Sequence, residues 1–147
     1  MNKIFTKSDI PDIVESFNKH IKKIVKILDN VLINNITYDT LKRRMGIAMN
    51  ETPIFLLQTG GNEIFKKKEF IINNTLDELF NKDITYYTNT VNISEDLKND
   101  INDKEIDNLF NMVKDCWNSF NLKEKNYINK IFKVLLSDYS KYKSINQ

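Results

Sequence analysis

The sequence predicts an all-α fold in one domain (residues 1–147), a compact bundle of five to seven helices that ends in a long antiparallel helical hairpin. Apolar residues recur at steps of three and four along most of the chain, which is the period of an amphipathic helix. The chain is 41% hydrophobic and 11% aromatic, so a domain of this length can bury a core without a metal or a disulfide. A strand is a candidate only within residues 83–94, where β-branched and aromatic residues gather. Since a single strand would have no partner, we expect an extended loop there.

The first helix is predicted to begin near Asp9 and to end at Asn34-Asn35. Ser8 or Asp9 can accept a hydrogen bond from a free amide of the first turn. Pro11 is tolerated in that turn because its missing N–H would have lacked a partner. The apolar stripe that defines this helix consists of Ile10, Ile13, Val14, Phe17, Ile21, Ile24, Val25, Leu28, Val31 and Leu32.

A second helix is predicted over residues 38–50, with Thr37 as its cap. Thr52-Pro53 repeats this start signal before residues 54–57, which are apolar on every side. We therefore expect residues 54–57 to form a short element at the centre of the core. Gly60-Gly61 is expected to end that element as a helix C-cap.

Two further helices are expected before the loop. Asn62 is a candidate cap for the first, which runs through Ile71 and turns Lys66-Lys67-Lys68 mostly toward solvent. Thr75 is expected to open the second, a short helix with Leu79 on its apolar side.

The last third of the chain predicts the hairpin. Ser94 can start a helix, and Asn121 can cap the final one, with Glu124 three residues later completing a capping box. The short break at Asn121 implies an antiparallel pair of long helices, and residues 140–147 are expected to fray. The residues expected to be largely buried are Phe17, Leu28, Leu56, Phe110, Trp117, Phe132 and Leu135.

The net charge of +2 hides a segregation of charge along the chain. Residues 1–72 carry 12 Lys or Arg against 8 Asp or Glu, residues 73–121 carry 4 against 10, and residues 122–147 carry 6 against 2. Two basic blocks therefore flank an acidic middle. A nucleic-acid-binding protein more often has one dominant basic face, so this distribution favours pairing of the blocks within the fold or between copies.

The sequence carries no catalytic, cofactor-binding or metal-binding signature. His20 is the one histidine and Cys116 the one cysteine, so a zinc site lacks ligands and an internal disulfide cannot form. We expect His20 at the surface or at the boundary of the core, and Cys116 as a partly buried structural thiol. The single thiol, a polar start unlike a signal peptide and the lack of a long apolar run predict an intracellular protein that does not span a membrane.

Two groups of residues are candidate binding surfaces. If the two basic triplets face one way, they supply cations for nucleic-acid phosphates. The tyrosines form a candidate protein-binding patch, because tyrosine loses little entropy on contact and keeps a polar group. The alternatives are solvated helix faces for the triplets and a loop pinned to the core for the tyrosines. The triplets are Lys42, Arg43 and Arg44 with Lys66, Lys67 and Lys68, and the tyrosines are Tyr86, Tyr87, Tyr139 and Tyr142.

Composition and one short segment bear on the origin of the chain. Asparagine, isoleucine and lysine make up 61 of the 147 residues, a bias toward AT-rich codons that indicates an AT-rich bacterium, a protist or a large DNA virus. Residues 117–125 (WNSFNLKEK), followed by Ile128, Ile131-Phe132 and Leu135-Leu136, resemble the C-terminal tails of small uncharacterised helical proteins of giant (nucleocytoplasmic large) DNA viruses. The resemblance implies a viral origin and carries over no catalytic residue.

These observations predict a non-enzymatic viral structural or adaptor protein that acts through protein contacts in the host cytoplasm or the virion. Its expected partner is another protein or a second copy of itself, with no cofactor. The alternative is a nucleic-acid-binding accessory factor that uses the two basic triplets. A third interpretation is an enzyme whose site carries no recognisable motif.

Overall fold

The computed structural model describes residues 4–81 and 104–145. Within these ranges all regular secondary structure is helical, which confirms the all-α prediction. The predicted loop at 83–94 and the helix start at Ser94 lie outside the described residues. The α-helices are α1 (Ile10–Asp29), α2 (Ile36–Glu51), α3 (Phe55–Lys66), α4 (Lys68–Ile72), α5 (Leu76–Phe80), α8 (Glu105–Asp115) and α9 (Leu122–Ile145), and the 3-10 turns are η1 (Lys7–Asp9) and η2 (Trp117–Ser119).

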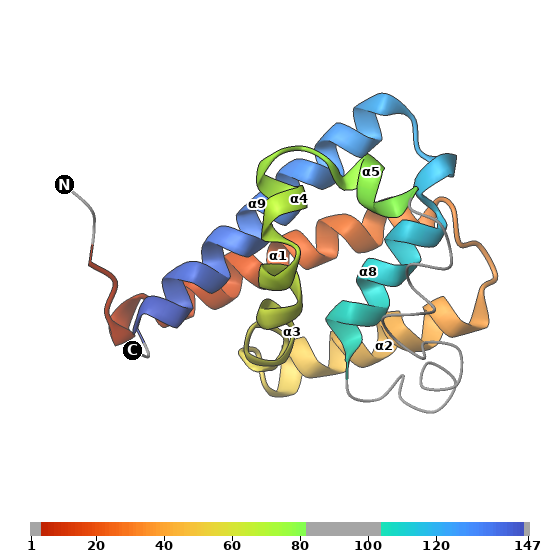
Figure 1. Cartoon of the computed structure of the whole chain (residues 1–147). Coiled ribbons are helices and arrows are strands. Elements are labelled where there is room, and N and C mark those ends of the chain that lie inside the picture. The colour runs from red at the N-terminus through yellow and green to blue at the C-terminus, as the bar shows by residue number, and fades with distance from the viewer. Residues whose placement is uncertain (1–3, 82–103, 146–147) are drawn as a thin grey trace.

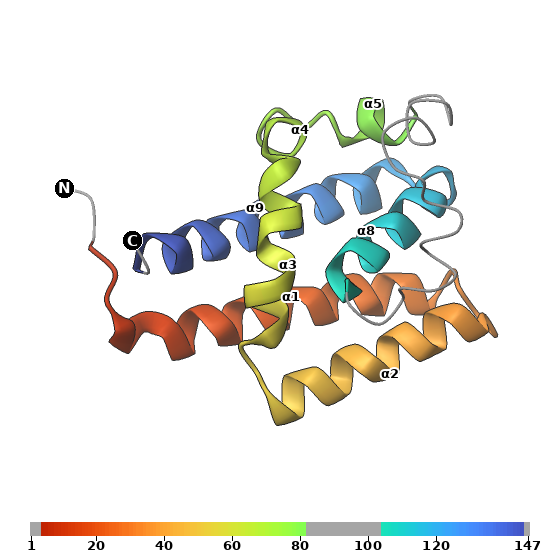
Figure 2. The same ribbon diagram turned by 60° about the horizontal axis from the view of Figure 1, so that its bottom comes forward.

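The two longest helices form the centre of the molecule. α1 and α9 lie side by side and antiparallel, and α3 crosses this pair (Figures 1 and 2). α8 packs on α3 and α2, while α4 packs on α9. The seven residues predicted to be largely buried are all at most 4% exposed, so the sequence pattern identified the core correctly.

The end of the first helix differs from the prediction. α1 ends at Asp29, and residues 30–35 form the turn into α2. Asn34 takes a left-handed conformation (φ 60°), and the Asn35 side chain accepts a hydrogen bond from the backbone N–H of Tyr38 at 2.9 Å. Asn35 is therefore the cap of α2, and Thr37, the predicted cap, lies exposed inside the helix.

The start of the first helix also differs in detail. Neither Ser8 nor Asp9 caps α1 through its side chain. Asp9 instead reaches back, and its Oδ2 accepts the backbone N–H of Thr6 at 2.9 Å across the preceding 3-10 turn. The carboxylate still lies where the positive end of the helix dipole favours it.

The glycine pair does not end a helix, contrary to the prediction. α3 continues through Gly60 and Gly61 to Lys66, and both glycines are buried with ordinary helical backbone angles. A Cβ on Gly60 would overlap the Ile106 side chain, and one on Gly61 would overlap the ring of Tyr139. The glycines therefore allow α3 to approach α8 and α9 closely.

The neighbourhood of the glycines corrects two further predictions. Asn62 is an exposed residue inside α3 and caps nothing, and the helix expected to run through Ile71 is interrupted at Lys67. Residues 54–57 are not uniformly buried, because only Leu56 and Leu57 are fully enclosed. Thr75 does open α5 as predicted.

The C-terminal helix begins as predicted and extends further. Asn121 Oδ1 accepts the backbone N–H of Glu124 at 2.8 Å, and Glu124 Oε1 accepts that of Asn121 at 3.0 Å, which confirms the capping box. α9 then continues to Ile145 through the segment expected to fray. The rings of Phe110 and Phe132, with centroids 5.2 Å apart, bring α8 against α9, although α1 is the more extensive partner of α9.

Candidate binding cleft and charged surface

The first basic triplet lies on α2 and is partly engaged within the fold. Lys42 Nζ is 3.0 Å from Asp29 Oδ1, which also accepts a hydrogen bond from the Tyr38 hydroxyl at 2.6 Å. Burial of the Asp29 carboxyl opposes ionisation, but these two hydrogen bonds hold its pKa below the usual range. Arg43 is exposed, whereas Arg44 is half-buried.

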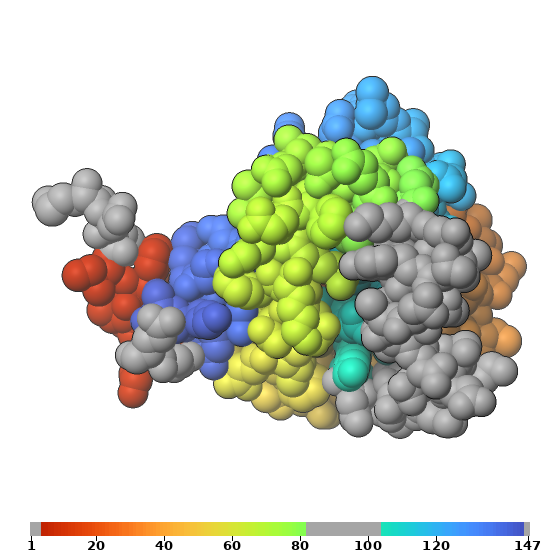
Figure 3. Space-filling view, in the orientation of Figure 1, coloured from red at the N-terminus to blue at the C-terminus, as the bar shows by residue number. Residues whose placement is uncertain are grey.

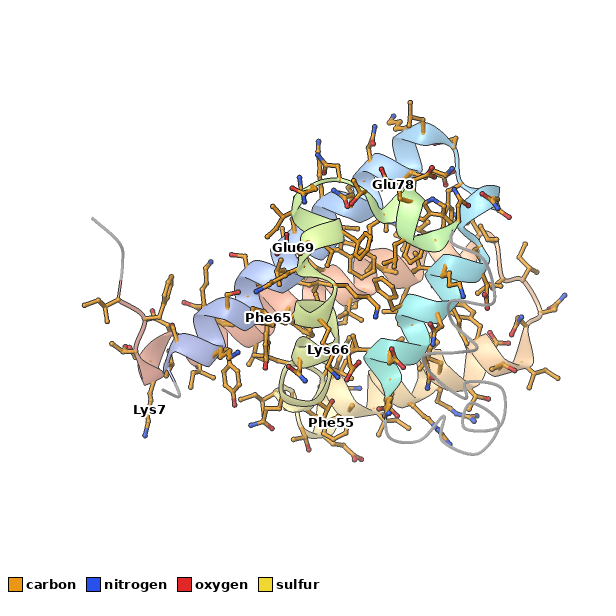
Figure 4. The ribbon with its side chains drawn as sticks, in the orientation of Figure 1. Lys7, Phe55, Phe65, Lys66, Glu69 and Glu78 are labelled. Carbon is orange, nitrogen blue, oxygen red and sulfur yellow. The ribbon has the colours of Figure 1, made fainter. Side chains whose placement is uncertain are left out.

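The second triplet spans the break between α3 and α4, and its three side chains have different neighbours. Lys66 Nζ lies 3.4 Å from Glu63 Oε1. Lys67 Nζ lies 5.1 Å from the centre of the Phe110 ring, and Lys68 Nζ lies 4.4 Å from that of Phe65, which Figure 4 shows on the α9 side of α3. Lys66 is exposed, whereas Lys67 and Lys68 are half-buried, so the prediction that this triplet faces mostly solvent was wrong for the latter two.

The two triplets do not form one continuous patch along an element. The first triplet lies in the middle of α2, which leads into the start of α3 (Figure 1), whereas the second triplet spans the end of α3 and the start of α4. Ion pairs and ring contacts occupy four of the six cations, namely Lys42, Lys66, Lys67 and Lys68.

The described tyrosines of the predicted patch support the contact between α3 and α9. Tyr139 is half-buried over Gly61, and its ring centroid lies 6.1 Å from that of Phe65. The Tyr142 hydroxyl accepts a hydrogen bond from Gln58 Nε2 at 3.1 Å. Tyr86 and Tyr87 lie outside the described residues.

The single histidine and cysteine have structural surroundings. His20 Nδ1 lies 2.7 Å from the backbone oxygen of Ser16, and the side chain is half-buried. Cys116 is buried, and burial together with the nearby charge of Asp115 raises the pKa of its thiol. In the described part of the chain, His, Cys, Asp and Glu side chains nowhere gather in the groups of three that a metal ion needs. No helix in that part is both long and apolar enough to cross a membrane.

A cleft that the sequence did not predict lies between the α4–α5 turn and the first turns of α9. Its volume is about 340 Å³. In the space-filling view, α4 and α5 meet the first turns of α9 at the top of the molecule (Figure 3). The residues that line the cleft are Asn74, Leu76, Asp77, Trp117, Leu122, Lys125, Asn126 and Asn129.

Asn129 of α9 holds one wall of this cleft in place by hydrogen bonds to residues of the α4–α5 turn region. The residue is 7% exposed, and its Nδ2 donates to the backbone oxygen of Ile71 at 3.4 Å and to Asn74 Oδ1. Asn74 holds the turn in a left-handed conformation (φ 59°), which asparagine tolerates well. These bonds fix the orientation of the Asn129 amide, and its enclosed Oδ1 has no hydrogen-bond donor among residues 4–81 and 104–145.

A fixed carboxylate lies at the rim. Asp77 Oδ1 accepts a hydrogen bond from Trp117 Nε1 at 2.8 Å and lies 3.4 Å from Lys125 Nζ. The hydrogen bond from Trp117 is the main cause that holds the pKa of Asp77 below its usual value, with Lys125 contributing in the same direction. The carboxylate is therefore ionised near neutral pH while its side chain remains 59% exposed.

The cleft is suited to binding. None of its eight lining residues is a serine, cysteine or histidine, so this set offers amide hydrogen bonds, a carboxylate, an ammonium and apolar surface. Leu122 is 73% exposed, which leaves an apolar side chain uncovered next to the amides. The sequence signal for this wall was the spacing of Leu122, Asn126 and Asn129 at steps of four and three, which places them on one side of a helix beside the core stripe.

Comparison of the chain with protein family models, curated proteins and solved structures gives no match.

Proposed function

We propose that this protein is a non-enzymatic structural or adaptor protein that acts through protein contacts. The observation that carries the proposal is the cleft beside α9, where an exposed leucine, Leu122, adjoins the side-chain amides of Asn74 and Asn126. Exposed apolar surface next to satisfiable polar groups is the composition of protein interaction sites. A giant-virus origin, with action in the host cytoplasm or the virion, belongs to the same proposal and is supported by the composition and the C-terminal resemblance.

Nucleic-acid binding by the basic triplets is the alternative. It would require Lys42 and Lys66 to exchange their carboxylate partners, Asp29 and Glu63, for phosphates. Salt-dependent binding of a polyanion grows with the number of cations that are available for it. The engagement of these side chains within the fold therefore favours protein contacts.

The test is affinity capture of the tagged full chain from cells of its native source, with and without nuclease. Leu122→Ser is compared with Ile36→Ser, because each residue is the first of its helix after an asparagine cap and they are 73% and 82% exposed. We expect partners that survive nuclease, are retained by Ile36→Ser and are lost with Leu122→Ser. Partners that disappear with nuclease would support the nucleic-acid alternative, and retention of all partners by Leu122→Ser would contradict the role of the cleft.

A further inference from the structure

We propose that one face of the α1–α9 pair binds the surface of a membrane that contains anionic lipids. This lysine face lies on the side of the pair away from α3, and it contacts the lipid headgroups without entering the bilayer core. The inference goes beyond the proposed function, because the cleft between the α4–α5 turn and α9 takes no part in it. The residues of the lysine face are Lys19, Lys23 and Lys26 of α1 with Lys123, Tyr127, Lys130 and Lys133 of α9.

The lysines of α1 form one row on the outer side of that helix. Lys19, Lys23 and Lys26 follow one another at steps of four and three, which is the spacing of neighbours along one side of a helix. Because an α-helix turns about 100° per residue, this row lies opposite Phe17 and Ile21. Both of these residues are fully buried, so the row points away from the core.

The lysines of α9 form a second row that faces the same way. Lys123, Lys130 and Lys133 are seven and three residues apart, and the buried Ile128 and Phe132 lie on the opposite side of the helix. α1 and α9 lie side by side, and α3 crosses both of them on the side nearer the viewer in Figure 1 (Figures 1 and 2). The two rows therefore lie together on the side of the pair that α3 does not cover.

The lysine face carries little negative charge. Residues 16–28 of α1 include four lysines and no Asp or Glu, and the one acid in residues 125–145 of α9 is Asp138, which is 3% exposed. The ion pairs within the described residues involve none of the six lysines of the face. The exposed carboxylates of Asp12 and Glu15 mark the end of the face on α1. Its cations are therefore available to an anionic partner.

The number and exposure of these cations suit an anionic lipid surface. Four of the six lysines are exposed, and the other two, Lys23 and Lys133, are half-buried. Clusters of roughly four to eight Lys or Arg side chains bind anionic leaflets, and each cation near the surface strengthens binding by about fivefold. Tyr127 lies in the α9 row and is 44% exposed, and tyrosine is enriched where proteins meet lipid headgroups.

The shape of the face favours a membrane over other polyanions. Two helices side by side form a broad layer, which a membrane surface meets with both lysine rows at once (Figure 2). A nucleic-acid duplex is convex and meets one row at a time, and an acidic protein must hold its carboxylates in register with both rows. Lysine is a point charge without the fixed fork of arginine, so the mobile headgroups of a fluid leaflet can match it in any arrangement.

The experiment is co-sedimentation of the full chain with sucrose-loaded vesicles. Vesicles of phosphatidylcholine with about 30% phosphatidylserine are compared with vesicles of phosphatidylcholine alone, at about 0.1 M and about 0.5 M salt. Labelled duplex DNA and poly-glutamate are titrated at the lower salt concentration as soluble polyanions. The comparison of wild type on the two kinds of vesicle depends on no variant.

Three variants, each with three cations replaced by Gln, locate the binding surface. The first lacks the α1 row, the second lacks the lysines of the α9 row, and the third is a matched control that lacks three exposed cations of α2 and α3. All three lose the same net charge, and each is compared with wild type by circular dichroism. The substitutions are Lys19→Gln, Lys23→Gln and Lys26→Gln in the first, Lys123→Gln, Lys130→Gln and Lys133→Gln in the second, and Lys42→Gln, Arg43→Gln and Lys66→Gln in the control.

We expect wild type to sediment with the anionic vesicles and not with the neutral ones, and its binding to weaken at the higher salt concentration because salt screens the charges. Each row variant should bind roughly tenfold or more weakly than wild type, since the loss of about fivefold per lysine multiplies over three positions. The control should bind within about threefold of wild type, because its cations lie away from the membrane and within screening distance only in part.

Three results would overturn the proposal. The first is no binding to the anionic vesicles, or equal binding to both kinds of vesicle. The second is a control variant that loses as much binding as the row variants, which would show that net charge and not this face is responsible. The third is DNA or poly-glutamate that binds more tightly per anionic charge than the vesicles and is released by the row variants, which would assign the lysine face to a nucleic acid or to an acidic protein.

Discussion

Asp138 is a buried carboxylate whose ionised form is disfavoured by its surroundings. It lies on α9 and is 3% exposed, and its Oδ2 has no hydrogen-bond partner within the described residues. Burial raises the pKa of this carboxyl, while a hydrogen bond with Ser16 and the charges of Lys141 and His20 oppose the shift. The folded state therefore favours the protonated form relative to the unfolded chain.

The sign of this shift predicts how stability depends on pH. The contribution of Asp138 is fully favourable below its ordinary pKa of 3.8 and is lost as the pH rises through its raised folded-state pKa. Asp138→Asn cannot ionise, so it should unfold at higher urea than wild type near about pH 7, and the difference should vanish at pH values below 3.8.

The control for this measurement is Glu15→Gln, a substitution at an exposed carboxylate of α1. Its urea midpoint should follow that of wild type across the same pH range. An Asp138→Asn variant that is less stable than wild type near neutral pH would show that the ionised carboxylate has a stabilising partner.

At the scale of the element, the caps decide where helices begin. The Asn35 side chain satisfies a free N–H at the start of α2, and Thr37 does not. Asn35→Ala should therefore lower the free energy of unfolding by about 1 kcal/mol, whereas Thr37→Ala should change it little or raise it, because alanine has the higher helix propensity. Chemical unfolding of both variants measures this difference, and equal losses would contradict the assignment of the cap.

The glycines of α3 and α2 provide a second comparison between elements. Gly60→Ala and Gly61→Ala each place a methyl group against a buried or half-buried side chain and should destabilise by roughly 1–3 kcal/mol. Gly46 lies inside α2 with nothing within 4 Å of an added Cβ, so Gly46→Ala should stabilise by about 0.5–1 kcal/mol. Thermal unfolding of the three variants tests the assignment, and a stabilising Gly61→Ala would show that α3 and α9 can separate without loss.

These two comparisons also show what the sequence could predict. The three-and-four spacing of apolar residues located α1, and the Asn121 box fixed the start of α9, because both signals are local. The prediction of a helix end at Gly60-Gly61 was wrong because the sequence alone does not separate a glycine in a helix C-cap from a glycine that lets a second helix pack closely. The Tyr139 ring against Gly61 identifies the second case. The cleft was missed because its walls come from segments around Asn74, Trp117 and Asn129 that only the tertiary fold brings together.

At the scale of the whole molecule, the charges are distributed so that basic and acidic groups meet within the fold. Lys42 pairs with Asp29 across the α1–α2 turn, and Lys125 pairs with Asp77 between α9 and α5. The second of these joins the basic C-terminal block to the acidic middle of the chain, as the segregation of charge in the sequence suggested. Each such pair at the surface contributes little to the free energy of unfolding. Their main effect is to favour the observed packing of α2 on α1 and of α9 on α5 over other arrangements.

This arrangement leads to a prediction about nucleic acid. Replacement of Lys42, Arg43, Arg44, Lys66, Lys67 and Lys68 by Gln should leave partner capture intact and lower stability by about 1–2 kcal/mol in total, the sum of a few exposed ion pairs and cation–π contacts.

Wild type should form no micromolar complex with DNA or RNA at about 150 mM salt, because most of these cations are engaged and the Asp77 rim repels phosphates. Fluorescence anisotropy with labelled oligonucleotides over a salt series measures this. A micromolar complex at that salt concentration, lost in the six-fold variant and falling steeply in affinity as salt rises, would mean that the triplets leave their partners for phosphates, and the nucleic-acid alternative would then explain the protein better than the cleft.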